Sequence, residues 1–235
     1  MGKALGQCYI SESEITLTPW SKTGRRFEEP PRSAKIARDT LTPMKTRLSP
    51  RFRLIGLLPL IFFLGQTIHY WRYGGMPNLL WMCNIGNLLL ALGLFLNHRE
   101  LIRAAAIWTI PGLLIWFLYV FLPGGNFPSS MLAHVGGIIV AMFVLSRVRM
   151  DRIAWLYAFV WYLFMQLSSR LTTPAPMNVN LAHAVQPGWE NSFNAYWKFW
   201  LVLTVLVAAG LWVIGMALSR IWPEPMSEPP AVAGG

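Results

Sequence analysis

Residues 196–218 read YWKFWLVLTVLVAAGLWVIGMAL, and Lys198 is the only charged side chain among them. A helix that crosses the hydrocarbon core of a bilayer needs about 20 predominantly apolar residues. This stretch meets that requirement without help from a neighbouring segment. It therefore predicts a membrane-spanning helix near the end of the chain.

Five further apolar segments precede this one. They cover residues 54–73, 78–96, 101–122, 129–145 and 153–169. Pro111 lies inside the third of them, where it is expected to kink the helix. The only long connection is 171–195, whose beginning TTPAPMNVN argues against another helix. The predicted fold is all-α, a polytopic bundle of six transmembrane helices within residues 54–220.

The composition of the chain excludes an ordinary soluble domain. Hydrophobic residues make up 54% of the 235 residues, and charged residues only 13%, about half the share in a typical soluble domain. A soluble fold of this length could not bury so many apolar side chains, so lipid is expected to cover much of the surface.

The basic residues predict an orientation. Eleven of the twenty Lys and Arg residues come before Leu54, so the net charge of +10 belongs to a membrane flank and does not indicate nucleic-acid binding. With the N-terminus inside, cytoplasmic segments hold seventeen basic residues and outer segments three, namely Arg72, Arg170 and Lys198. This bias predicts both termini in the cytoplasm of a multi-pass protein of the bacterial inner membrane.

The two ends of the chain are predicted to be disordered tails. Residues 1–53 are basic and show no sustained apolar period, and 221–235 follow the last apolar segment. Met44 is a second candidate start, which would place the first 43 residues upstream of the protein. Cys8 lies in the tail and Cys83 in an apolar segment, so we expect no disulfide between them.

Polar residues gather in the outer halves of the predicted helices. At a rise of 1.5 Å per residue, Cys83 is expected roughly 8 Å below the outer boundary, with His134 at a similar depth. The same level or the loop above it holds Gln66, His69, Asn84, Asn87, Gln166, Asn178, Asn180 and His183. Because the cytoplasmic halves hold few polar groups, this one-sided cluster predicts a site in the outer leaflet.

Cys83 and His134 are the candidate catalytic residues. A thiol becomes a good nucleophile when a base takes its proton, and a histidine on an adjacent helix could do so. Such a pair would perform acyl transfer through a thioester, with Asn84, Asn178 or Asn180 orienting the imidazole or stabilising the oxyanion. The alternatives are a cysteine buried as a small hydrophobe and a histidine that serves an interhelical hydrogen bond. Asn87 and His69 are expected to support the same site.

Metal binding is a weaker reading of the same residues. Cys83, His69, His134 and His183 are suitable zinc ligands, but none lies at a local spacing typical of metal sites. We therefore expect no metal and no cofactor.

Three motifs carry a resemblance: PNLLWMCNIGNLLLAL at 77–92, SSMLAHVGGIIV at 129–140 and NVNLAHAVQPGWENSFNAYWKFWLVLTVL at 178–206. They resemble, in that order, the second-helix motif, the fourth-helix histidine segment, and the final loop and helix of the YwaF-like family of bacterial integral membrane proteins. Eukaryotic relatives include the androgen-induced lipid hydrolases and a phospholipid acyltransferase. The resemblance implies six helices, with Cys83 as nucleophile and His134 as base acting on a lipid ester.

Together these observations favour a cofactor-independent lipid acyltransferase or hydrolase whose site opens to the outer leaflet. Its expected partners are membrane lipids. The alternative is a non-catalytic subunit associated with other membrane subunits, or a small transporter. A transporter typically shows matching broken helices in two halves, and only Pro111 with Gly112 interrupts a segment here.

Overall fold

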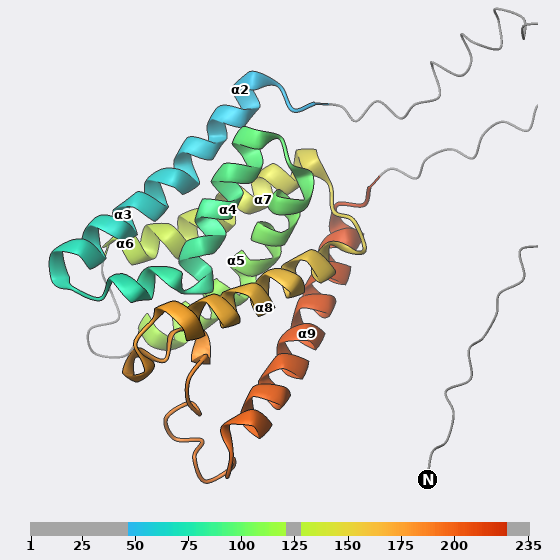
Figure 1. Cartoon of the computed structure of the whole chain (residues 1–235). Helices are drawn as coiled ribbons and strands as arrows, with labels where there is room; N and C mark the ends of the chain where they lie inside the picture. The colour runs from blue at the N-terminus through green and yellow to red at the C-terminus, as the bar shows by residue number, and fades with distance from the viewer. Residues whose placement is uncertain (1–46, 121–127, 225–235) are drawn as a thin grey trace, which may run out of the picture. The chain divides into compact units, whose positions relative to one another are not determined.

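The computed structural model describes residues 47–120 and 128–224, all of them within the compact unit Lys45–Gly235. Its regular structure is helical apart from one isolated bridge between Met150 and Pro223. Figure 1 shows α4 and α5 between the flanking helices α3 and α9. The predicted tails lie largely in 1–46 and 225–235, outside the described residues.

Each of the six predicted segments corresponds to a helix. The first combines a turn, α2, and the longer α3, and the fourth combines α6 and α7. The bounds are α2 (Pro50–Arg53), η1 (Leu54–Gly56), α3 (Leu57–Tyr73), α4 (Met82–Leu96), α5 (Arg99–Val120), α6 (Pro128–Met131), η3 (Leu132–Gly136), α7 (Gly137–Val148), α8 (Ala154–Thr172) and α9 (Tyr196–Ile221).

Among the described residues, four helices are long and apolar enough to cross a membrane. They are Pro50–Tyr73, Arg99–Leu118, Pro128–Val148 and Tyr196–Ile221. α4 is apolar but has only 15 residues, and the 19-residue α8 carries more polar side chains. The chain is therefore an all-helical membrane protein. Six spans and cytoplasmic termini stay predictions.

The first helix begins at Pro50, four residues before the predicted start. Ser49 is its N-cap, because its hydroxyl accepts a hydrogen bond of 3.3 Å from the backbone N–H of Phe52. Pro50 suits the first helical position, where its missing N–H costs nothing. The helix thus extends into the part of the chain expected to be tail.

The second helix begins at Met82, later than the predicted Asn78. A short 3₁₀ turn, η2 (Met76–Leu80), comes first. Trp81 then adopts an extended conformation with φ −57° and ψ 137°. This break places Cys83 at the second residue of α4, so the prediction of a continuous helix from Asn78 is wrong. The depth of Cys83 below the outer boundary stays a prediction.

The core lies where α4, α5 and α7 meet. Its fully buried side chains include Leu90, Leu94, Ile102, Ile107 and Leu145. α4 and α5 approach closely, since a Cβ on Gly93 would lie 2.9 Å from the backbone nitrogen of Ile102. The α4–α5 pair therefore forms a fixed support for the residues where α4 begins.

α9 packs unevenly along its length. In its C-terminal half, Leu211 and Leu218 are buried, and a Cβ on Gly215 would lie 2.9 Å from Cβ of Trp155. In its N-terminal half, Val205 and Leu206 are exposed. The C-terminal half of α9 thus holds most of its buried residues, whereas Phe199 is the only buried residue in its N-terminal half.

A polar network closes the end of the bundle where α5 begins. The buried Arg103 donates from Nε to the carbonyl of Arg149 at 2.9 Å and from Nη2 to Glu224 at 2.8 Å. Its Nη1 lies 3.7 Å from a carboxylate oxygen of Asp151. The network ties α5 to the connection between α7 and α8 and to the chain after α9.

Candidate functional site

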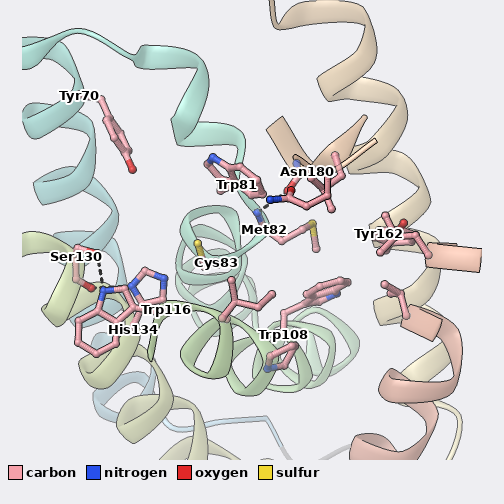
Figure 2. Close-up of a pocket in the computed structure, with 17 residues that line it drawn as sticks. Tyr70, Trp81, Met82, Cys83, Trp108, Trp116, Ser130, His134, Tyr162 and Asn180 are labelled. Atoms are coloured by element: carbon pink, nitrogen blue, oxygen red, sulfur yellow. Dashed lines mark hydrogen bonds between the residues drawn. The ribbon is translucent and has the colours of Figure 1, made fainter. Parts of the chain in front are cut away.

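Three of the predicted site residues, Cys83, His134 and Asn180, line a cavity of about 410 Å³. Side chains from α3, α4, α5, α8, α9 and the turn before α7 line it (Figure 2). The lining residues are Tyr70, Trp81, Met82, Cys83, Trp108, Pro111, Gly112, Ile115, Trp116, Ser130, His134, Tyr162, Asn180, Leu181, Gln186, Leu203 and Val207. None of these is Asp, Glu, Lys or Arg, so the described wall of the cavity carries no permanent charge.

Cys83 lies at the beginning of α4. At this helix end the N–H of Met82 donates to Oδ1 of Asn180, and the N–H of Asn84 donates to the carbonyl of Trp81. The positive end of the helix dipole favours negative charge near the sulfur. A Cβ on Gly112 of α5 would lie 3.2 Å from Cβ of Cys83, so glycine at 112 gives the cysteine its room.

His134 lies in η3, a single π-helical turn within the fourth helix. Its Nδ1 is 2.8 Å from the carbonyl oxygen of Ser130. Because a carbonyl can only accept, Nδ1 must carry the proton, and Nε2 of the neutral ring is left as the basic atom. The ring also stacks on Trp116, with centroids 5.6 Å apart and planes at 16°.

A second hydrogen bond holds the tryptophan in place. Nε1 of Trp116 donates to the hydroxyl of Ser130 at 3.0 Å. Ser130 therefore contacts both aromatic rings, through its carbonyl to His134 and through its hydroxyl to Trp116. The imidazole is held on two sides, and its orientation toward the cavity is fixed before any ligand binds.

The structure brings Cys83 and His134 to the same cavity (Figure 2). Among the described residues the thiol and the imidazole form no hydrogen bond with each other. Catalytic hydrogen bonds are often long in unliganded enzymes and tighten when substrate binds. Proton transfer between the two residues would require such an approach.

Asn87 connects the cysteine helix to the histidine turn. Its Nδ2 donates to the carbonyl of Cys83 at 3.1 Å and to that of Ala133 at 3.0 Å. The side chain is buried, and a Cβ on Gly137 would lie 2.7 Å from its Oδ1. Asn87 does not line the cavity, so its role is to set the position of α4 against η3.

Asn180 lines the cavity and caps α4. Its Oδ1 accepts from the backbone N–H of Met82 at 3.1 Å. Its Nδ2 donates to the carbonyl of Leu80 and to the hydroxyl of Ser169, both at 2.8 Å. The connection between α8 and α9 is thereby fixed over the break that precedes Cys83.

The remaining predicted site residues do not line the cavity. Nδ2 of Asn84 donates to the carbonyl of Asn78 at 3.0 Å. Oδ1 of Asn178 accepts from the backbone of His183 and Ala184, which closes a loop. The ring of His69 packs against Tyr73, with centroids 4.9 Å apart. These three side chains shape the surroundings of the site.

Several lining residues were not predicted as site residues. The aromatic residues Trp108, Trp116 and Tyr162 lie within predicted apolar segments. The sequence alone does not distinguish them there from core residues. Ser130 did carry a signal, because it lies four residues before His134 and so shares its helix face.

Among residues 47–120 and 128–224, no group of three or more His, Cys, Asp or Glu residues could hold a metal ion.

Comparison with protein-family models, curated proteins and solved structures found no similar protein.

Proposed function

We propose that the chain catalyses acyl transfer or hydrolysis of a lipid ester in the outer leaflet of a bacterial inner membrane. One observation carries the proposal: a cysteine at a helix N-terminus shares an uncharged cavity with a histidine whose Nε2 is the basic atom. The resemblance to YwaF-like proteins supports the same pair. Cys83 is the nucleophile and His134 the general base.

The reaction proceeds in two balanced halves. Nε2 of His134 takes the thiol proton, and the sulfur of Cys83 attacks the ester carbonyl carbon. The carbon–oxygen bond breaks, and the imidazolium returns the proton to the leaving alkoxide, which gives a thioester and an alcohol. Water or a second alcohol then attacks the thioester and gives its proton to Nε2. The carbon–sulfur bond breaks, and the thiolate recovers the proton.

The environment of Cys83 suits the charges that develop. Cys83 lies in the first turn of α4, where the positive end of the helix dipole favours a thiolate or an oxyanion formed beside it. Asn180 holds this helix end by accepting from Met82. Trp116 and Ser130 hold the imidazole. The arrangement needs no cofactor.

A thiol-reactive acyl probe tests the assignment. The chain has two cysteines, so Cys8→Ala leaves Cys83 as the only thiol and serves as the parent protein. The probe should acylate Cys83 at neutral pH, and His134→Ala should slow acylation by about 10²- to 10⁴-fold, the usual contribution of a general base. His98→Ala is the matched control, because His98 lies exposed beside Glu100.

Lipid turnover in membranes then decides the function. Cys83→Ala should abolish the change in ester lipids that the parent protein causes. Undiminished turnover by Cys83→Ala would refute the nucleophile, and full acylation in folded His134→Ala would refute the base.

A non-catalytic role is the second candidate. It is favoured by the absence of a thiol–imidazole hydrogen bond among the described residues and by the contacts that already occupy His134. The chain would then be a lipid-binding subunit of a membrane complex or a small transporter. Cys83→Ala would leave such a role intact.

A further inference from the structure

The cavity has two chemically different ends. Figure 2 shows Ser130 and His134 on one side and Tyr162 on the other, with Cys83 and Trp108 between them. Ile115 of α5 and the α9 residues Leu203 and Val207 are aliphatic members of the lining, and Ile115 is 53% exposed. We call Tyr162, Leu203 and Val207 the apolar end.

The N-terminal half of α9 forms the wall of this apolar end. Leu203 and Val207 line the cavity, while Val205 and Leu206 of the same turns are each 59% exposed. A Cβ on Gly210 would meet no atom within 4 Å. Exposed aliphatic residues on a membrane-spanning helix face lipid. Among the described residues, α9 is therefore the single helix between this part of the cavity and the bilayer, and no other helix packs tightly on its exposed face.

The chemistry of the lining selects the occupant. The described lining has no charged side chain, so a phosphate or carboxylate inside would be desolvated without a counter-ion. A hydrocarbon chain has no such cost, and the volume of about 410 Å³ lies within the common range for small-molecule sites, roughly 300–1,000 Å³. Lipid acyl chains are also the hydrocarbon that surrounds α9.

We propose that the apolar end binds the acyl chain of the substrate. The chain enters from the bilayer, past the N-terminal half of α9. Leu203 and Val207 determine which chains fit, and charged head groups stay outside. The proposal rests on the proposed function only in placing the ester carbonyl at Cys83. Binding of the chain itself does not require the reaction.

Photo-cross-linking tests chain binding without catalysis. The probe is a monoacylglycerol with a diazirine in its acyl chain, added to the detergent-purified full chain, and cross-linked residues are located by mass spectrometry. Cross-links at Leu203 and Val207 should saturate and be displaced by unlabelled monoacylglycerol. Cross-links at the lipid-facing Leu206 should not saturate.

Matched substitutions on α9 sharpen the test. Leu203→Trp should fill the apolar end and lower the saturable cross-linking at Val207 at least tenfold. Leu206→Trp, which adds the same bulk on the exposed face, should leave it unchanged. Val207→Trp, read by cross-linking at Leu203, replaces Leu203→Trp if that variant does not fold. A probe whose acyl chain ends in a carboxylate should give no saturable cross-link.

The outcomes separate the two proposals. Cys83→Ala should keep the saturable cross-links while losing turnover. If it keeps both, the nucleophile is wrong and the acyl site stands. Non-saturable labelling at both Leu203 and Val207, or labelling that Leu203→Trp and Val207→Trp do not change, would overturn the acyl site whatever the turnover.

Discussion

Asn87 in α4 donates a hydrogen bond of 3.0 Å to the carbonyl oxygen of Ala133, the residue before His134. The same amide group donates to the carbonyl of Cys83. One buried carboxamide therefore links the backbones that carry the proposed nucleophile and the proposed base. Such a link places the two residues relative to each other without touching the substrate.

Asn87→Ala should affect both stability and reactivity. Loss of its hydrogen bonds should lower the free energy of unfolding by about 1–3 kcal/mol and slow acylation of Cys83. Asn84→Ala is the matched control, because Asn84 lies on the same helix but bonds to Asn78 and not to the histidine turn. Thermal unfolding in detergent and the acylation rate measure the two effects. Equal acylation rates for both variants would contradict the positioning role.

Asn180→Ala should destabilise the junction before α4. The variant loses hydrogen bonds to Met82, Leu80 and Ser169, and the free energy of unfolding should fall by about 2 kcal/mol. Asn180 also has a φ of 54°, which glycine adopts more easily than alanine. If the lost side-chain hydrogen bonds outweigh the backbone effect, the free energy of unfolding of Asn180→Gly should fall as well. Asn194→Ala, at an exposed position, should leave the unfolding temperature unchanged.

Arg103→Lys should not replace the arginine. The guanidinium donates in different directions to Arg149 and Glu224, which a lysine ammonium at one point cannot reproduce. The partner carboxylates of Glu224 and Asp151 are partly exposed, so solvent screening limits the expected loss to about 1–2 kcal/mol. Hydrogen exchange after α9 should rise. Arg152→Ala, at an exposed position, should change neither quantity.

Reporter fusions test the predicted topology. The bias of basic residues places fusions after Arg103, Arg152 and Arg220 in the cytoplasm and fusions after Pro123 and Gly188 on the outer side. If the fusion after Arg220 reports the outer side, the chain must cross the membrane an odd number of times, given a cytoplasmic N-terminus. α4 or α8, the two helices outside the set of four candidate spans, would then be the first to reassess.

The helices were predictable because apolar length is a strong signal, and their ends were not. The break at Trp81 depends on Asn180, which is 98 residues away from its hydrogen-bond partner Met82. No local pattern encodes such a contact. The π-helical turn around His134 was missed for a similar reason, because its amide partner Asn87 comes from another helix.

The site was only partly accessible to sequence reasoning. Matched depth on two helices was enough to suggest that Cys83 and His134 lie together, and the structure places both on one cavity. Depth says nothing about which way a side chain points, so Asn84 was grouped with the site although it bonds to Asn78. Trp116 was missed because an aromatic ring that orients a histidine looks like any other apolar residue.

The shortness of α4 has a consequence for water. Its 15 residues span only about 22 Å, against a hydrocarbon thickness of about 30 Å. If α4 spans the membrane in the predicted orientation, with Leu96 at the inner boundary, the end that carries Cys83 lies several ångströms below the outer one. The depth of that end would then set how often the proposed thioester meets water before another alcohol.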